Sequence, residues 1–215
     1  MVSVQTFLVV AVLIASVVVH EVAHAWQARR EGDDTAERLG RITLNPLPHL
    51  DPIGSVILPL LLAWSGGIIF GWAKPVPVNP ANYRNYVAGD IRVSLAGIAS
   101  NLMLAALATL LSGIVLKVLG PGAFGGYIMS VLSYAIFINL ILAFFNLIPI
   151  PPLDGSHVLA HMLPAGAAQS YRELGRYGLV LVMLFVFLAP SALNFLLTPV
   201  YFLQGLADQF IRLWI

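Results

Sequence analysis

Long apolar segments, separated by short polar or proline-rich stretches, make up most of this chain. The segments cover residues 6–29, 53–72, 91–119, 127–147, 177–188 and 193–210. The longer segments reach or exceed the roughly 20 helical residues that are needed to cross a bilayer. The pattern predicts an all-α membrane protein, a polytopic helical bundle of about five to six transmembrane or re-entrant segments.

The composition supports a membrane location. Hydrophobic residues make up 59% of the 215 residues and charged residues 10%, whereas a globular domain carries about 25% charged residues. The formal net charge of +1 and the lack of a basic cluster give no reason to expect nucleic acid as a partner. The first segment lacks a basic leader and a cleavage site, so we expect it to be a retained helix. We interpret residues 1–215 as a single intramembrane domain in the cell (cytoplasmic) membrane.

Two histidines and a glutamate interrupt the first apolar segment. His20 and His24 are four residues apart, so they lie on one face of a helix, where both can bind one metal ion. Glu21 completes the H-E-x-x-H pattern of zinc hydrolases, in which the glutamate acts as general base on a water molecule. In a soluble helix so short a pattern often arises by chance. At the middle of a membrane helix an ionisable group costs about 2.5–3.5 kcal/mol, which favours a metal ion shared by all three.

A third protein ligand is expected, because catalytic zinc commonly has three and leaves a fourth position open. The chain has no cysteine, so the ligand must be a His, Asp or Glu side chain. Asp154 is the candidate, since it follows a proline-broken stretch at residues 149–152 that turns its carboxylate back into the bundle. Alternatively, Asp154 caps the short helix predicted at residues 156–162. We predict one Zn²⁺ per chain, bound by His20, His24 and Asp154.

This ligand set determines the topology. His24 lies near the C-terminal end of its helix, so the helices at 6–29 and 127–147 must end at the same membrane face. These two helices are then parallel, and the helix at 91–119 runs in the opposite direction. Residues 53–72 cannot span the membrane in this arrangement, so we expect them to enter and return, which their prolines and glycines permit.

The distribution of basic residues agrees with this topology. All eleven except Lys117 are predicted on one side, which the positive-inside rule identifies as the cytoplasm. The residues predicted on this side are Arg29, Arg30, Arg38, Arg41, Lys74, Arg84, Arg92, Arg172, Arg176 and Arg212. The active site is therefore expected toward the cytoplasmic side of a multi-pass protein.

Three motifs follow one another along the chain. They are His20-Glu21-Val22-Ala23-His24, Ser94-Leu95-Ala96-Gly97-Ile98-Ala99-Ser100-Asn101, and Phe145-Asn146-Leu147-Ile148-Pro149-Ile150-Pro151-Pro152-Leu153-Asp154-Gly155. In order and spacing they resemble the motifs of the site-2 protease family of intramembrane zinc metalloproteases. The chain resembles a minimal member without PDZ or CBS domains.

The resemblance implies roles for several residues. It implies that His20, His24 and Asp154 bind zinc and that Glu21 activates the water molecule. It also implies that Asn146 and Asn101 lie beside the site, as contacts to the substrate backbone or to the transition state. Residues 71–78 are similar to the membrane-embedded β-element that presents substrate in this family.

The function predicted is hydrolysis of peptide bonds within or near transmembrane segments of membrane proteins, which is regulated intramembrane proteolysis. A transmembrane protein substrate and the lipid bilayer are the expected partners. Two other classes are a membrane metal-ion carrier and a catalytically silent homologue that binds membrane helices. Glu21 beside the ligands argues against a carrier, and the intact motifs argue against a silent homologue.

The remaining histidines are weaker candidates. His49 is expected in an interfacial loop, although it can approach the site, and His161 is expected at the interface. His157 lies one turn beyond Asp154. It either contacts the metal site or only packs at the interface, and the sequence favours neither role.

Overall fold

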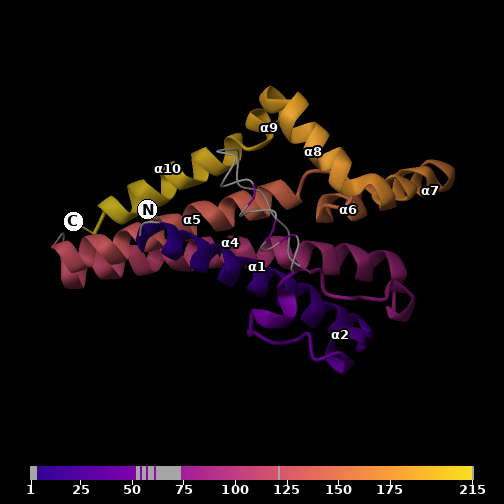
Figure 1. Cartoon of the computed structure of the whole chain (residues 1–215), viewed down its shortest axis with the longest axis horizontal. Coiled ribbons are helices and arrows are strands. Elements are labelled where there is room, and N and C mark those ends of the chain that lie inside the picture. Colours follow the sequence, from indigo (N-terminus) through magenta and orange to yellow (C-terminus); the bar gives the residue numbers. More distant parts are fainter. Residues whose placement is uncertain are drawn as a thin grey trace.

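Three long helices form the framework of the computed structural model (Figure 1). The structure describes residues 4–51, 54, 57, 61, 74–120 and 122–214. Within this part, α1 (Val4–Glu31), α4 (Tyr86–Leu119) and α5 (Ala123–Asn146) are the helices long and apolar enough to cross a membrane. A bent pair of C-terminal helices would raise their number to four if it counts as one span.

Local sequence explains where these helices begin and end. Asn85 caps α4, because its side chain accepts a hydrogen bond from the backbone N–H of Ala88 at 3.0 Å. Gly120 follows the last residue of α4, and α5 ends at Asn146, shortly before Pro149. The predicted helices at 91–119 and 127–147 are therefore confirmed, each with a start several residues earlier than the apolar pattern indicates.

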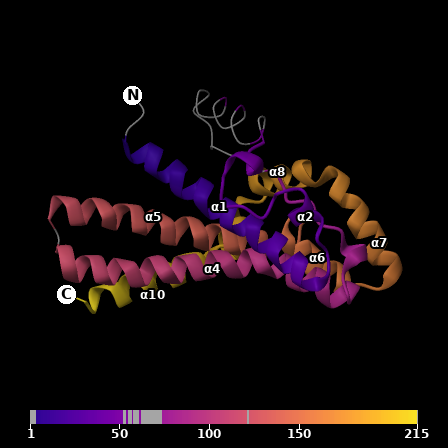
Figure 2. The ribbon, with the colours of Figure 1, turned by 90° about the horizontal axis from the view of Figure 1, so that it is seen from below.

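The direction of the three helices is the predicted one. Figure 2 shows α1 and α5 running the same way, with α4 antiparallel to both. The apolar core between α4 and α5 contains Ala105, Ile136 and Leu140, which are each less than 5% exposed. Many large apolar side chains on the outer faces of α4 and α5 are exposed, as expected for surfaces that contact lipid.

The C-terminal third of the chain is a series of shorter helices. These are α6 (Asp154–Met162), α7 (Ala165–Glu173), η4 (Leu174–Tyr177), α8 (Gly178–Leu188), α9 (Pro190–Leu196) and α10 (Thr198–Arg212). The polar connection predicted at residues 165–176 is thus helical. Pro190 begins α9, and α9 is bent by 96° relative to the helical stretch Ala165–Leu188 that ends with α8.

Helix α10 corrects one prediction about the basic residues. It packs along α4 and α5, and Val200 and Ile211 complete their apolar core (Figure 1). The chain end therefore returns to the far end of α4, where Lys117 lies over the ring of Trp214 at 5.7 Å. Arg212, next to Trp214, lies with Lys117 and not with the basic residues near the metal ligands. The prediction for Arg212 was wrong because α10 runs along α4 and α5 toward the far end of α4 and does not end near the metal ligands.

Polar connections cover the end of the bundle at which α1 stops. They contain α2 (Thr35–Arg38) and the 3-10 helices η1 (Leu47–His49) and η3 (Pro80–Asn82). None of the described residues forms a strand, and residues 74–78 are neither helix nor strand. Residues 71–73 and nearly all of residues 53–72 lie outside the described part. The β-element and the re-entrant segment therefore stay predictions.

The buried carboxylate of Asp33 joins these connections. It accepts hydrogen bonds from the backbone N–H of Asn79 at 2.7 Å, from the side chain of Asn82 at 2.8 Å, and from Thr35. Burial by itself raises the pKa of the Asp33 carboxyl, but these hydrogen bonds outweigh burial and hold the pKa below its ordinary value. The charged form of Asp33 therefore stabilises the folded connections.

Asp33→Asn is expected to destabilise the protein by about 1–3 kcal/mol at neutral pH, because an amide cannot accept all of these bonds. Thermal unfolding in detergent measures the loss. Asp34→Asn is the control, since among the described residues the side chain of Asp34 pairs at the surface with Arg38, and this variant should lose less than about 1 kcal/mol.

The pH dependence of this difference has a definite sign. Because folding lowers the pKa of Asp33, the wild-type advantage should be constant above about pH 5. It should then decline as the pH falls through the folded pKa, which lies below the ordinary value of an Asp carboxyl. An Asp33→Asn protein as stable as the wild type at pH 7 would contradict this role.

Candidate active site

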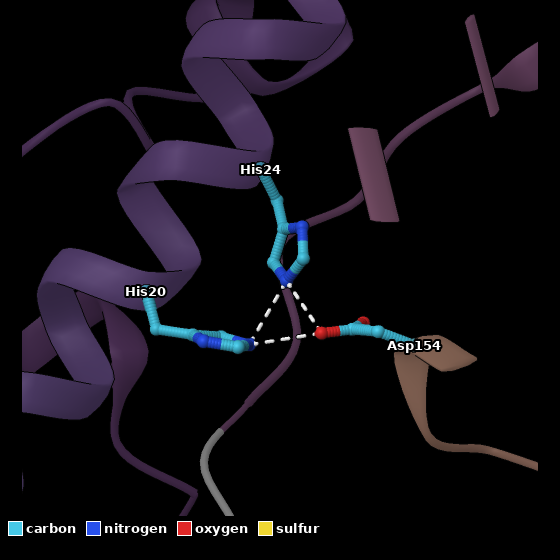
Figure 3. A group of neighbouring side chains, drawn as sticks. All are labelled: His20, His24 and Asp154. Atoms are coloured by element: carbon cyan, nitrogen blue, oxygen red, sulfur yellow. Dashed lines mark hydrogen bonds and ion pairs between the residues drawn. The ribbon is translucent and has the colours of Figure 1, made fainter. Parts of the chain in front are cut away.

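Three side chains from two distant parts of the chain meet at one point (Figure 3). The Nε2 atoms of His20 and His24 on α1 lie 3.0 Å apart. The Oδ2 atom of Asp154 on α6 lies 3.2 Å from Nε2 of His20 and 3.4 Å from Nε2 of His24. Figure 3 shows the two imidazoles and the carboxylate pointing at a common centre. The side chains are only 8%, 12% and 19% exposed.

The backbone of α4 orients the imidazole of His24. Its Nδ1 atom lies 2.7 Å from the backbone carbonyl oxygen of Val93. A carbonyl oxygen can only accept a hydrogen bond, so Nδ1 carries the proton and donates it. The lone pair of His24 is therefore on Nε2, which is the atom that faces Asp154.

The chain between α5 and α6 places Asp154. Asp154 is the first residue of α6, and Leu153 occupies the N-cap position, so Asp154 is not the capping residue. A side chain at Gly155 would meet the carbonyl oxygen of Leu147, so only glycine lets α6 start against this connection. The capping alternative for Asp154 is therefore not supported by the structure.

The donor set suits a zinc ion. Tetrahedral zinc with ligand bonds of about 2.0–2.2 Å holds its ligand atoms roughly 3.3–3.5 Å apart, close to the separations found here. The Oδ2 atom of Asp154 is buried and has no hydrogen-bond donor among the described residues. Within the described part of the chain, His20, His24 and Asp154 form the one group of such side chains whose ligand atoms converge within 4.8 Å. Two imidazoles and a carboxylate are a common catalytic zinc set.

Gly97 makes room for this group on α4. A Cβ atom at this position would lie 2.5 Å from Nε2 of His24 and 2.7 Å from Nε2 of His20. Real Cβ atoms do not approach other atoms so closely, so any larger residue must displace both imidazoles. The space that the two imidazoles occupy thus explains why residue 97 is a glycine.

Glu21 faces the polar connections. Its Oε2 atom accepts a hydrogen bond of 2.8 Å from the backbone N–H of Val76. Arg41 holds the same segment through the carbonyl oxygens of Lys74 and Pro75, at 2.8 and 3.3 Å. The backbone N–H of Lys74 donates to the carbonyl oxygen of His49 at 2.9 Å. Residues 74–78 are therefore fixed beside the predicted general base.

The two asparagines of the motifs lie in different surroundings. Asn101 is fully buried, and its side chain contacts His20 and other groups inside the bundle. The partly buried Asn146 is the last residue of α5, and its side chain donates to the carbonyl oxygen of Leu142 at 2.9 Å. Asn101 thus reaches the site through His20, whereas Asn146 lies at the start of the connection that leads to Asp154.

The remaining histidines do not join the three ligands. His49 is buried, and its Nε2 atom lies 3.0 Å from the carbonyl oxygen of Thr43. His157 and His161 both approach Asp90 on α4, at 3.4 and 2.7 Å. The side chain of His161 is only 5% exposed, so it is buried against Asp90, and its position at the membrane interface stays a prediction. The contacts of His157 and His161 with Asp90 thus connect α6, which carries Asp154, to α4.

Sequence reasoning missed two polar residues near the ligands, Ser16 and Asn139. Ser16 is four residues before His20, so it continues the polar stripe of α1. Asn139 lies two turns before Asn146 on α5. Their spacing from residues already selected is the signal that could have found both.

Gly97→Ala is expected to remove zinc binding, because its new methyl group occupies the space of both imidazoles. Alanine favours a helix over glycine by about 1 kcal/mol, so the helical content should persist. Metal analysis of purified protein with circular dichroism measures both. Gly126→Ala on α5 is the matched control, since a Cβ atom there meets nothing within 4 Å. Full zinc content in Gly97→Ala would contradict this description of the site.

Comparison with known proteins identifies the family. Peptidase family M50 matches residues 52–190, more than half of the chain. YwhC of Bacillus subtilis, which is named as a zinc metalloprotease, is 36% identical over 215 residues, covering 99% of this chain and 92% of YwhC. Rip2 of Mycolicibacterium smegmatis, named in the same way, is 34% identical and covers 87% of this chain and 68% of Rip2. Rip2 of Mycobacterium tuberculosis strain H37Rv is 30% identical, with 96% and 76% covered.

No solved structure matches the chain. The resemblance to the site-2 protease family, predicted from three motifs, is confirmed by the family match and by these relatives. The helices long enough to span a membrane agree with it. The chain belongs to peptidase family M50 and is a membrane zinc metalloendopeptidase of the site-2 protease family.

Proposed function

We propose that this protein cleaves peptide bonds within or near transmembrane segments of other membrane proteins. The observation that carries the proposal is the meeting of His20, His24 and Asp154 inside a bundle of membrane-spanning helices, with Glu21 adjacent. The site lies beside the polar connections, because Glu21 accepts a hydrogen bond from Val76 within them. We therefore expect the bond that is cleaved to lie close to the membrane surface.

His20, His24 and Asp154 would hold the metal ion, one per chain. Zinc bound there would supply a Lewis acid and an acidified water molecule for hydrolysis. Glu21 acts as general base, taking a proton from the attacking water and passing it to the leaving amine. Asn146 has a second amide hydrogen beside the one that it donates to Leu142, and we assign it to the oxygen on which charge develops.

Residues 74–78 are proposed to present the substrate. A helical carbonyl is already bonded within its own helix, so a transmembrane substrate must unwind before its peptide bond can be attacked. The segment is held next to Glu21 through Val76 and through the contacts of Arg41. A substrate held extended along this segment by main-chain hydrogen bonds would pass the metal ligands.

The basic residues favour a cytoplasmic position for this end of the molecule. Arg29 and Arg30 close α1, and Arg84 and Arg92 lie at the start of α4. By the positive-inside rule the active site then faces the cytoplasm. The opposite end carries fewer basic residues, namely Lys117 and Arg212.

Glu21→Gln is expected to bind zinc as the wild type does but to cleave a model transmembrane substrate about 100- to 10,000-fold more slowly. This is the usual contribution of a general base. Cleavage by purified protein in detergent or liposomes, together with zinc content, measures both effects. Glu173→Gln, at an exposed position on α7, is the control and should retain full activity. Wild-type rates in Glu21→Gln would overturn the mechanism, and zinc flux without cleavage would favour a carrier.

Asp154→Ala is expected to weaken zinc binding more than about 100-fold, beyond the 10- to 100-fold typical of residues that only support a ligand. The measurement is competition with a chelator. Asp208→Ala, which removes an exposed carboxylate on α10, should leave the affinity unchanged. Stoichiometric, tight zinc in Asp154→Ala would show that another group is the third ligand.

A further inference from the structure

A continuous chain of buried polar side chains connects His20 to all three spanning helices. Asn101 on α4 lies 2.6 Å from Nδ1 of His20 and 2.8 Å from the side chain of Asn139 on α5. Asn139 lies 2.9 Å from the hydroxyl of Ser16, which returns to α1. Each of these four residues is at most 6% exposed, so water does not replace the contacts.

The direction of the hydrogen bonds is determined from the α5 end. The Nδ2 atom of Asn139 lies 2.8 Å from the backbone carbonyl oxygen of Ala135. A carbonyl oxygen can only accept, so this end of the amide must be the NH₂ group. Its second hydrogen points to the Ser16 hydroxyl. The carbonyl oxygen of the Asn139 amide is left to face Asn101.

The orientation of the Asn101 amide follows in the same way. Its Nδ2 atom must donate to the amide oxygen of Asn139, and it also lies 3.4 Å from the backbone carbonyl oxygen of Ser16. The remaining Oδ1 atom of Asn101 faces Nδ1 of His20 and can only accept. Nδ1 of His20 must therefore carry the proton, which leaves the lone pair on Nε2, facing His24 and Asp154.

We propose that Asn101, Asn139 and Ser16 are positioning residues that fix His20 in the tautomer able to bind the metal through Nε2. This inference rests on the proposed function, because it assigns a task only if His20 is a metal ligand. His24 obtains the same tautomer from the carbonyl oxygen of Val93, a backbone group of one helix. His20 depends on side chains of three helices, so packing of α1, α4 and α5 prepares its ligand atom.

The tautomer can be measured directly in the zinc-free protein. Nitrogen-15 NMR of histidine-labelled, detergent-solubilised full chain distinguishes a protonated Nδ1 from a protonated Nε2, and the spectrum of His20→Gln assigns the signals. In the wild type, His20 is expected to be protonated on Nδ1. A wild-type His20 that carries a proton on Nε2 and none on Nδ1 would overturn the proposal without any variant.

Variants test whether the chain causes this state. Asn101→Leu removes the acceptor, so a mixture of His20 tautomers and about 10- to 100-fold weaker zinc binding are expected. Asn139→Leu, one step further away, should have a smaller effect in the same direction, and Ser16→Ala about a threefold loss of affinity. Ser112→Ala is the matched control, since Ser112 is a buried serine whose hydroxyl donates to the carbonyl oxygen of Ala108 in its own helix.

The outcomes separate this proposal from the proposed function. Unchanged tautomer and zinc affinity in Asn101→Leu would overturn the positioning role, while cleavage by the wild type would leave the protease function standing. The opposite result is a wild type that binds zinc tightly with His20 protonated on Nδ1 but cleaves no transmembrane substrate. It would overturn the protease function and leave the positioning role standing. If the leucine variants do not fold, the wild-type spectrum and the comparison of Ser16→Ala with Ser112→Ala decide.

Discussion

The structure depends on bringing three electron-pair donors together inside an apolar bundle. The Nε2 atoms of His20 and His24 and the Oδ2 atom of Asp154 face one another at 3.0 to 3.4 Å. Such atoms repel unless a cation lies among them or one of them carries a proton, and burial strengthens the repulsion. A shared cation, such as the zinc ion proposed for this site, would remove this repulsion and account for these residues in an otherwise apolar interior.

Each spanning helix contributes differently to this arrangement. α1 supplies both imidazoles on one face, because they are four residues apart. α4 runs antiparallel and supplies the acceptors for both Nδ1 atoms, together with the space left by Gly97. α5 supports Asn101 and leads into the proline-rich connection that delivers Asp154. A change in the packing of any one helix would thus move a ligand atom.

The polar connections contribute the part of the site that a helix cannot provide. A helix uses its own backbone N–H groups, whereas the N–H of Val76 is free to bind the carboxylate of Glu21. Asp33 and Arg41 hold the connections by bonds to their backbone and to Asn82. Glu21, the proposed general base, is therefore placed where a membrane helix meets irregular backbone, at the end of the bundle that carries the polar connections.

The sequence by itself determined the features that depend on local order. The spacing of His20 and His24 defines a helical face, the lack of cysteine restricts the third ligand, and Pro149 marks the end of a helix. These signals need no knowledge of neighbouring helices. They also sufficed for the direction of the three long helices, because a single metal site restricts which ends can meet.

Only the tertiary structure decided which polar groups face one another. Asn101, expected beside the substrate, lies against His20, and Asn139 and Ser16 belong to the same chain of hydrogen bonds. Likewise His161 binds Asp90, and Arg212 lies at the end of the molecule opposite to the one expected. The physical reason is that lipid is as apolar as the protein interior, so hydrophobicity does not separate lipid-facing from helix-facing positions. The partner of a buried polar group follows from the rotation and register of packed helices, which no local pattern contains.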